Sequence, residues 1–230
     1  IEEKCKIVDV YEALPGFLDD RATQVERTRL ETGFKTFDDW YGGIYIKGVY
    51  VFAAPAKVGK STFLGALANQ MVELPQNNMK VLILDTELET EFNLSRLSSS
   101  LTGENEFEFL EGSFAKNKRI VDKIQGAIKE NKHLRGKVFH SYVADLGIDD
   151  ILSFARRWYV TNIKPGEYAL IIYDYIKLAG GQTVLSDSWK EYQEIGEKTD
   201  KLKKFVSSLP RAALATSVQT NASGNIAMSQ

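Results

Sequence analysis

The chain has 230 residues, 43% of them hydrophobic and 26% charged, which is the composition of one sizeable folded domain and not of a disordered or fibrous protein. Its formal net charge of −2 and its pI near 5.9 argue against a dedicated duplex-binding module, which is usually strongly basic. They leave open nucleic acid that is held by a few loop residues from each subunit of an oligomer.

The first 31 residues, Ile1 to Glu31, are charged and contain the sequence ALPGFLDD, which predicts a helix followed by a turn. We expect this segment to be a linker or a docking segment ahead of the main domain, which spans residues 32–230. The chain begins with Ile1 instead of Met and stops at NIAMSQ without a capping element. We therefore expect it to be a piece of a longer protein, truncated at the carboxyl-terminal end of the domain.

Four apolar runs of strand length follow: VYVFAA, VLILD, YALIIYD and AALATS. Each is almost unbroken and rich in β-branched, aromatic or small residues, as in strands that are buried on both faces. KVFHSYV is a candidate for a further strand, and helical patterns lie between the runs at residues 61–73, 91–101, 117–130, 148–159 and 189–208. This alternation predicts an α/β fold with a mostly parallel central sheet, helices on both faces and ligands at the carboxyl ends of the strands.

The sequence VFAAPAKVGKST, residues 51–62, connects the first apolar run to the first helix. It resembles the phosphate-binding pattern G-x-x-x-x-G-K-[ST] but has Ala54 in place of the first glycine. Alanine is acceptable there if its φ is negative, whereas Gly59 is needed where the backbone approaches the phosphates. Lys60 is expected to reach the β- and γ-phosphates, and the Ser61 hydroxyl to hold Mg²⁺. The alternative is an ordinary strand-to-helix turn with an exposed lysine. The expected nucleotide-binding residues are Ala54, Pro55, Ala56, Lys57, Val58, Gly59, Lys60, Ser61 and Thr62.

Acidic residues follow two of the apolar runs. YALIIYD ends in Asp174, the Walker-B arrangement, and this carboxylate is expected to contact Mg²⁺ next to Ser61. An aspartate that caps a strand-to-loop turn is the weaker alternative. VLILDTELE carries Asp85, Glu87 and Glu89, and we expect its strand to be a neighbour of the phosphate-loop strand, close to the γ-phosphate. Glu87 is the best candidate to activate the attacking water, whereas Glu89 or Asp85 is expected to be structural or solvent-facing.

The end of the last apolar run, ATSVQTN, places Gln219 and Asn221 at the carboxyl edge of the sheet. A neutral amide there can sense a γ-phosphate by hydrogen bonding, and the alternative is a plain loop glutamine. The loop AGGQTVLSD, residues 179–187, is expected either to contact DNA or to be an ordinary surface loop. Trp189 and Tyr192 are expected to pack in the core and not to stack on bases.

Cysteine and histidine are scarce in this chain. The single cysteine, Cys5, allows no internal disulfide, and with only His133 and His140 beside it we expect no zinc site and no catalytic histidine. No apolar run approaches the roughly 20 residues that a membrane span needs. We therefore expect a cytoplasmic protein that makes no contact with a membrane.

Five motifs occur in the order that is found in RecA-like ATPase cores: TGFKTFDDWYGG (residues 32–43), the phosphate loop, LDTELE, IIYDYIKL and SVQTN. Over residues 32–221 the chain most resembles the C-terminal motor domain of DnaB-type replicative helicases of bacteria or phages. That family has T-G-F-x-x-L-D before the first strand, a Walker-B strand ending in D-Y-L-Q-L and a glutamine motif after the next strand. Here Phe37 replaces the leucine and Lys177 replaces the glutamine of D-Y-L-Q-L, whereas the missing first glycine of the loop is common in the family.

The resemblance implies a RecA-like P-loop NTPase core that uses ATP and Mg²⁺. It implies Lys60 and Ser61 for phosphate and metal, and Asp174 for magnesium. It also implies Glu87 as the catalytic base and Gln219 as the residue that couples the γ-phosphate to DNA. A hexameric ring with single-stranded DNA in its centre is a further implication, with primase or a helicase loader as additional partners. Residues 1–31 would correspond to the linker between subunits.

Three functions remain open at this stage. The ATP-hydrolysing motor of a hexameric replicative DNA helicase is favoured by the DYIKL stretch. The second is a RecA- or KaiC-like recombinase or regulatory ATPase that assembles without unwinding, and the third is a nucleotide-gated assembly or loading protein with little turnover. In DnaB-like rings an arginine of the neighbouring subunit completes the site, and it comes from a strand beyond the glutamine motif. We expect that arginine to lie beyond Gln230, so that a protein ending there would bind ATP but hydrolyse it slowly.

Overall fold

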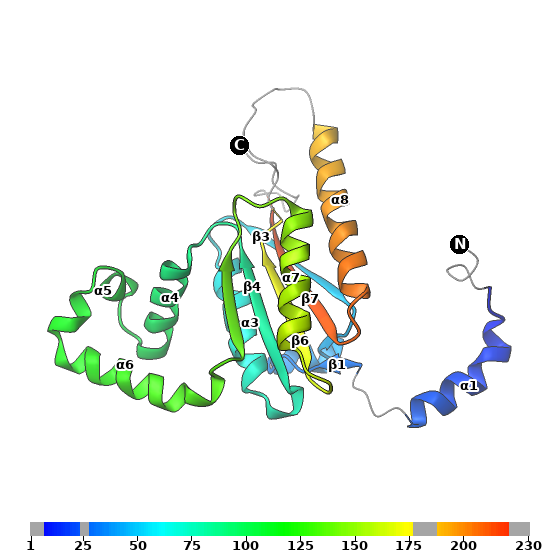
Figure 1. Ribbon diagram of the computed structural model, residues 1–230, viewed down its shortest axis with the longest axis horizontal. Helices are drawn as coiled ribbons and strands as arrows, with labels where there is room; N and C mark the ends of the chain where they lie inside the picture. The colour runs from blue at the N-terminus through cyan, green and yellow to red at the C-terminus, as the bar shows by residue number, and fades with distance from the viewer. Residues whose placement is uncertain (1–6, 24–27, 177–187, 221–230) are drawn as a thin grey trace.

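A five-stranded sheet forms the centre of the computed structural model, which describes residues 7–23, 28–176 and 188–220 (Figure 1). In spatial order the strands are β3 (Val49–Pro55), β7 (Ala212–Thr220), β6 (Tyr168–Asp174), β4 (Met79–Asp85) and β5 (Val138–Tyr142). Each neighbouring pair in this sheet is parallel. The predicted α/β fold with a parallel sheet is therefore confirmed, and KVFHSYV does contain a strand.

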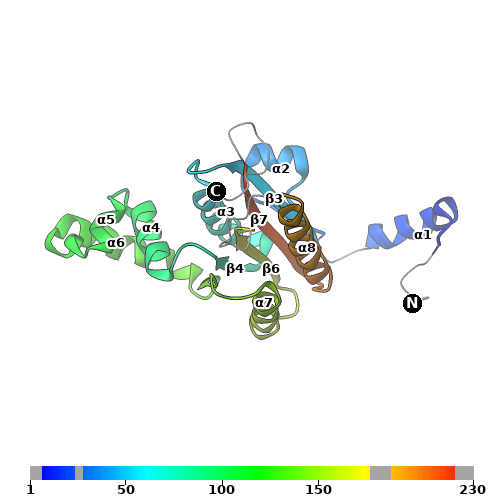
Figure 2. The same ribbon diagram turned by 90° about the horizontal axis from the view of Figure 1, so that it is seen from above.

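Helices cover both faces of the sheet, as Figure 2 shows from above. Because side chains alternate along a strand, Ile171 packs into a cluster under α7 (Ile148–Asn162) and α8 (Ser188–Ser207). Its neighbour Ile172 packs into a second cluster under α3 (Lys60–Glu73). The strands β6 and β7 are buried almost throughout, which explains their near-continuous apolar sequence.

The first strand, β3, departs from the prediction that it is buried on both faces. Within the described residues it pairs only with β7, so that it forms an edge of the sheet. Tyr50 and Phe52 pack toward α3 and Val49 packs toward α8. Val51, on the side of Val49, is 46% exposed. The prediction for this strand was wrong because an apolar run does not distinguish a central strand from an edge strand.

The amino-terminal segment forms one continuous helix, α1 (Val10–Thr23), where the sequence predicted a helix and then a turn. Asp9 starts it, since its carboxylate accepts hydrogen bonds from the backbone N–H groups of Tyr11 and Glu12. Pro15 lies inside the helix and removes one backbone hydrogen bond without ending it. The helix buries none of its residues, and its role as a linker remains a prediction.

A small substructure of residues 29–45, which we call the latch, precedes the central sheet in the chain. The antiparallel strands β1 (Arg29–Leu30) and β2 (Ile44–Tyr45) enclose α2 (Lys35–Tyr41). The carboxylate of Asp38 accepts hydrogen bonds from the backbone N–H and the hydroxyl of Thr32, at 2.9 and 2.8 Å, and from the N–H of Gly33 at 2.9 Å. Gly33 has a φ of 79°, which glycine adopts without steric cost. The T-G-F-x-x-x-D motif is thus a local structural element.

Replacing Asp38 with alanine should destabilise the domain by about 2 kcal/mol, because three hydrogen bonds to one charged acceptor are lost. Asp39→Ala is the matched control, since Asp39 is exposed and, among the described residues, forms only an i,i+4 ion pair with Lys35. Urea unfolding followed by circular dichroism measures both free energies. Equal losses in the two variants would contradict the assignment of a latch.

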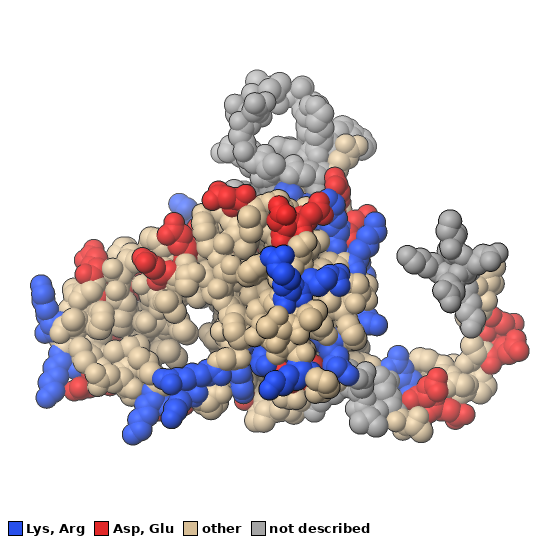
Figure 3. Space-filling view, in the orientation of Figure 1, with Lys and Arg blue, Asp and Glu red and all other residues tan. Residues whose placement is uncertain are grey.

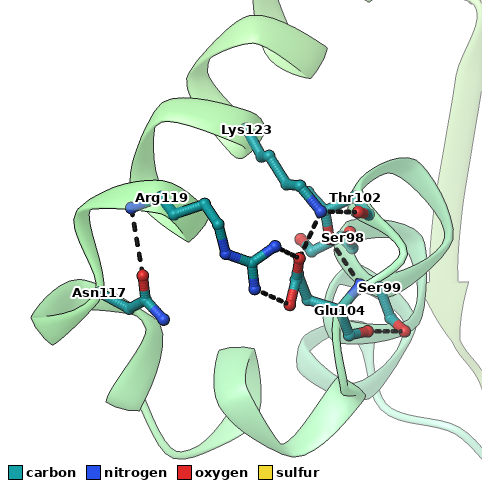
Figure 4. Close-up of polar contacts among 7 residues, drawn as sticks. All are labelled: Ser98, Ser99, Thr102, Glu104, Asn117, Arg119 and Lys123. Carbon is teal, nitrogen blue, oxygen red and sulfur yellow. Dashed lines mark hydrogen bonds and ion pairs between the residues drawn. The ribbon is translucent and has the colours of Figure 1, made fainter.

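Three further helices project from the side of the sheet that carries β5 (Figure 1). They are α4 (Thr90–Thr102), α5 (Glu106–Leu110) and α6 (Lys118–Glu130), and short 3-10 turns occur at η2 (Pro75–Asn77), η3 (Ser113–Lys116) and η4 (Asn131–Leu134). Figure 4 shows that Glu104, which follows α4, connects the end of this helix to α6, because its carboxylate accepts hydrogen bonds from Arg119 and Lys123 on α6. These two bonded cations hold the pKa of Glu104 below its ordinary value.

Candidate nucleotide-binding site

The loop that connects β3 to α3 has the backbone geometry of an anion-binding turn. Gly59 has a φ of 94°, and Lys57 has a φ of 61°, which is rare for a residue with a side chain. Ala54 is not among the residues with positive φ, so that alanine fits where the common pattern has glycine. The helix α3 begins at Lys60, directly after Gly59, and its N-terminal N–H groups favour a bound anion.

Lys60 folds back over its own loop. Its ammonium group donates hydrogen bonds to the carbonyl oxygens of Ala54, at 3.3 Å, and of Pro55, at 2.9 Å. The loop residues from Pro55 to Gly59 are exposed, so the concave side of the loop is open to solvent. The lysine therefore lies in the position from which its charge can move onto a phosphate group.

The buried carboxylate at the end of β6 lies next to the start of α3. Asp174 accepts a hydrogen bond from the Ser217 hydroxyl at 2.8 Å, and the Ser61 side chain lies close enough to influence its pKa. Burial raises the pKa of Asp174 above its ordinary value, the two serine hydroxyls oppose this shift, and the charges of Asp85 and Glu87 add to it. A cluster of oxygen donors with unbalanced negative charge fits a hard cation such as Mg²⁺.

Replacing Asp174 with asparagine should raise the thermal stability of the nucleotide-free protein at neutral pH and abolish Mg²⁺-dependent nucleotide binding. The raised pKa means that the ionised carboxylate destabilises the folded state at pH values above this pKa, and that the destabilisation disappears as the pH falls through it. Asparagine keeps an acceptor for Ser217 and removes the charge. Thermal denaturation should show a gain in Tm that shrinks at acidic pH. A variant less stable than wild type at neutral pH would contradict this account.

The loop after β4 carries Glu87 and is organised by Asp85. The buried Asp85 carboxylate accepts hydrogen bonds from the N–H groups of Glu87 and Leu88 at 2.8 and 2.7 Å. Glu87 and Glu89 are both exposed, and Glu89 precedes the first residue of α4. Asp85 is therefore a structural residue, one of the two roles that the sequence left open for it, and the exposed Glu87 is free to meet a ligand.

Tyr175, for which no role was predicted, contacts Glu87. The Tyr175 hydroxyl donates a hydrogen bond to the Glu87 carboxylate at 3.0 Å. Burial, together with the negative charge of Glu87, raises the pKa of Tyr175 to about 12, so its hydroxyl stays protonated and remains a donor. Its position directly after the Walker-B aspartate was the only available signal.

The order of the strands corrects one expectation about this site. The prediction that β4 lies next to β3 was wrong, because β7 and β6 lie between them. The carboxyl end of β4 nevertheless lies beside that of the Walker-B strand β6, because Asp85 pairs in register with Asp174. The Thr86 N–H also donates to the carbonyl oxygen of Asp174 at 2.8 Å. The loop that carries Glu87 is therefore held next to the carboxyl end of the Walker-B strand.

Gln219 lies on β7, between the phosphate-loop strand and the Walker-B strand. It is in register with Ala54 of β3, and it is partly exposed near the carboxyl end of its strand. The structure thus places it at the same edge of the sheet as Lys60 and Asp174. Asn221 and the predicted DNA loop, residues 179–187, lie outside the described residues, as do the side chains of Trp189 and Tyr192.

The face seen in Figure 3 carries acidic side chains mostly along its upper edge and basic side chains across its middle and lower part. Among the helices of residues 7–23, 28–176 and 188–220, none combines the length and the apolar character that a membrane crossing requires.

A parallel sheet with a lysine-bearing loop at one strand, a buried aspartate at the end of another and helices on both faces defines a P-loop NTPase domain of the RecA-like class. Residues 29–222 match the DnaB-like helicase C-terminal domain family. This match covers most of the chain, so the chain belongs to the family of DnaB-like helicase C-terminal domains.

Solved structures support the same fold. The chain is similar to a solved ATPase domain, with a TM-score of 0.71 and 20% identity, over 95% of this chain and 73% of that one. It is also similar to a DnaB-like replicative helicase whose structure was described with its interactions with primase, with a TM-score of 0.71 and 20% identity. That match covers 94% of this chain and 49% of the other, so the chain spans about half the length of that helicase. Comparison with curated protein sequences finds no significant match.

Proposed function

We propose that this domain binds Mg²⁺–ATP in the loop between β3 and α3 and uses its hydrolysis to move along single-stranded DNA as part of a hexameric ring. The observation that supports this proposal is the position of the three residues in one parallel sheet: Lys60 follows the loop after β3, Asp174 ends β6 and Glu87 follows β4. The carboxyl ends of the strands are where ligands bind in such folds.

Each residue of the site has a proposed role. Lys60 exchanges its contacts with loop carbonyls for the β- and γ-phosphates, while the other loop residues supply backbone N–H groups. Ser61 and Asp174 hold Mg²⁺, which neutralises charge on the phosphate oxygens. Glu87 orients the attacking water and accepts its proton. Gln219 lies on β7, between the phosphate-loop strand β3 and the Walker-B strand β6. Its proposed role is to contact the γ-phosphate and to transmit the loss of this phosphate to the DNA-binding residues.

The partners follow from the family and from the motifs. DNA-binding residues are proposed in the loop that follows the Walker-B strand and in the segment after Gln219. Residues 1–31 are proposed to connect neighbouring subunits, and residues 32–230 to form the ATPase domain. Because a similar helicase was described with primase, we include primase or a helicase loader as a candidate partner of the cytoplasmic assembly.

The alternative, a RecA- or KaiC-like ATPase that assembles without unwinding, shares the same fold. The match to the DnaB-like family and the DYIKL stretch favour the helicase. A protein with little turnover, the third possibility, would be favoured if Glu87 did not face the γ-phosphate. ATP-dependent strand displacement separates the helicase from both.

The ring is tested by steady-state ATP hydrolysis of the full-length protein, measured against protein concentration with and without single-stranded DNA. A ring completed by a neighbouring arginine should show turnover per subunit that rises with concentration, since such a residue contributes about 10³- to 10⁵-fold to phosphoryl transfer. DNA should stimulate the assembled form. Brisk turnover by a monomer, independent of concentration, would contradict the proposal.

A further inference from the structure

His140 lies directly beneath the loop that carries Glu87. It is on β5, where it pairs in register with Ile83 of β4, and its side chain is only 8% exposed. Its Nδ1 atom lies 3.0 Å from the Thr90 hydroxyl oxygen. Its Nε2 atom lies 3.8 Å from Oδ2 of Asp85 and forms no hydrogen bond within the described part of the chain.

These two neighbours are the two ends of the Glu87 loop. Asp85 is the last residue of β4 and Thr90 is the first residue of α4. The Oδ1 atom of Asp85 already accepts the N–H groups of Glu87 and Leu88, so only Oδ2 is turned toward the histidine. One imidazole ring therefore spans the base of the loop.

The chemistry of the ring makes this contact directional. When the Thr90 hydroxyl donates to Nδ1, the proton of a neutral imidazole is on Nε2, which faces the Asp85 carboxylate. At 3.8 Å the N–H attracts the Asp85 carboxylate electrostatically without a hydrogen bond, and this attraction favours the carboxylate orientation that makes the two backbone hydrogen bonds placing Glu87. Buried polar groups without a hydrogen-bond partner are rare, and within the described part of the chain Nε2 is one of them, with the Asp85 carboxylate in front of it.

We propose that His140 is a positioning residue that holds the loop bearing Glu87 from β5, on one side of β4. Tyr175, directly after β6 on the other side of β4, holds the Glu87 side chain. This inference rests on the proposed function of Glu87. It predicts an effect on the chemical step alone, because β5 and the phosphate-loop strand β3 lie at opposite ends of the described sheet. Nucleotide affinity should therefore not depend on His140.

The test compares His140→Ala with His133→Ala in the full-length protein with single-stranded DNA. The chain has two histidines, and His133 is an exposed residue of η4 paired with Glu73, which makes it a matched control. We expect His140→Ala to lower kcat for ATP about tenfold with KM unchanged, since small displacements of a catalytic group cost up to 10²-fold, and to lower Tm because the side chain is buried, so that the rates are measured well below Tm. His133→Ala should leave all three values unchanged.

Two milder variants keep the proposal testable if His140→Ala does not fold. His140→Gln retains an N–H that can reach Asp85 and should recover part of kcat, whereas Thr90→Val removes only the hydroxyl that orients the ring and should lower kcat by a smaller factor. Unchanged kcat in His140→Ala, or in both milder variants, would overturn the proposal, and so would a loss confined to KM or Tm.

Glu87→Gln, measured in the same assay, separates this proposal from the function on which it rests. If Glu87→Gln keeps full turnover, the proposed role of Glu87 is wrong and His140 has nothing to position. If Glu87→Gln is inactive and His140→Ala has wild-type kcat, only the positioning role is overturned. If Glu87→Gln is inactive and His140→Ala loses kcat with KM unchanged, both stand.

Discussion

Lys60→Ala should weaken nucleotide binding by roughly 30-fold or more, because truncating one partner of a charge pair that the bound phosphates would bury costs about 2–5 kcal/mol. In the free protein the ammonium group is bonded to the carbonyl oxygens of Ala54 and Pro55, inside the loop that the phosphates would enter. On binding, these neutral contacts are exchanged for charge-assisted bonds to phosphate oxygens. Titration calorimetry with Mg²⁺–ATP measures the affinity.

Lys57→Ala is the control for this experiment. Lys57 belongs to the same exposed loop, and alanine does not differ from lysine in the strain of a positive φ. It removes the same charge from the same loop without removing the group that lies over the loop carbonyls. Undiminished ATP binding by Lys60→Ala would mean that this loop is not the phosphate site, and an equal loss in the control would contradict a specific role for Lys60.

Glu87→Gln should keep ATP binding and reduce turnover by about 10²- to 10⁴-fold, since an amide cannot accept a proton from the attacking water. The substitution preserves the surroundings, because the amide oxygen still accepts the Tyr175 hydroxyl and the backbone N–H still reaches Asp85. Single-turnover hydrolysis measures the chemical step, and nucleotide titration checks that binding is intact.

Glu89→Gln is the matched control, because Glu89 is exposed on the same loop and precedes α4. It should hydrolyse ATP at the wild-type rate. If Glu89→Gln is inactive and Glu87→Gln is active, the assignment of the base is off by two residues along the chain.

The sheet and its ligand edge could be predicted because their signals are local. Runs such as YALIIYD are apolar throughout since β6 is covered on both faces, and parallel strands that alternate with helices bring their carboxyl ends to one edge. The loop from Ala54 to Thr62 could be found for the same reason, since it needs one glycine and one lysine at fixed spacing before a helix.

What could not be predicted depends on contacts between distant residues. Periodicity carries no information on strand order, so β4 was wrongly placed beside β3. It does not reveal an edge strand either, and β3 was wrongly expected to be buried on both faces. Asp85 and His140 are 55 positions apart and meet only because β4 and β5 pair in register. His140 therefore looked uninformative in the sequence, although it spans the base of the Glu87 loop.

The central claim is that this domain converts ATP hydrolysis into unwinding, and strand displacement on a forked DNA duplex tests it most directly. The full-length protein is assayed with Mg²⁺–ATP, without nucleotide, and as the Lys60→Ala variant, with release of one labelled strand as the signal. The account predicts that the labelled strand is released only by the wild-type protein in the presence of Mg²⁺–ATP. Intact duplex in the presence of rapid, DNA-stimulated ATP hydrolysis would contradict it and would favour an ATPase that assembles on DNA without unwinding.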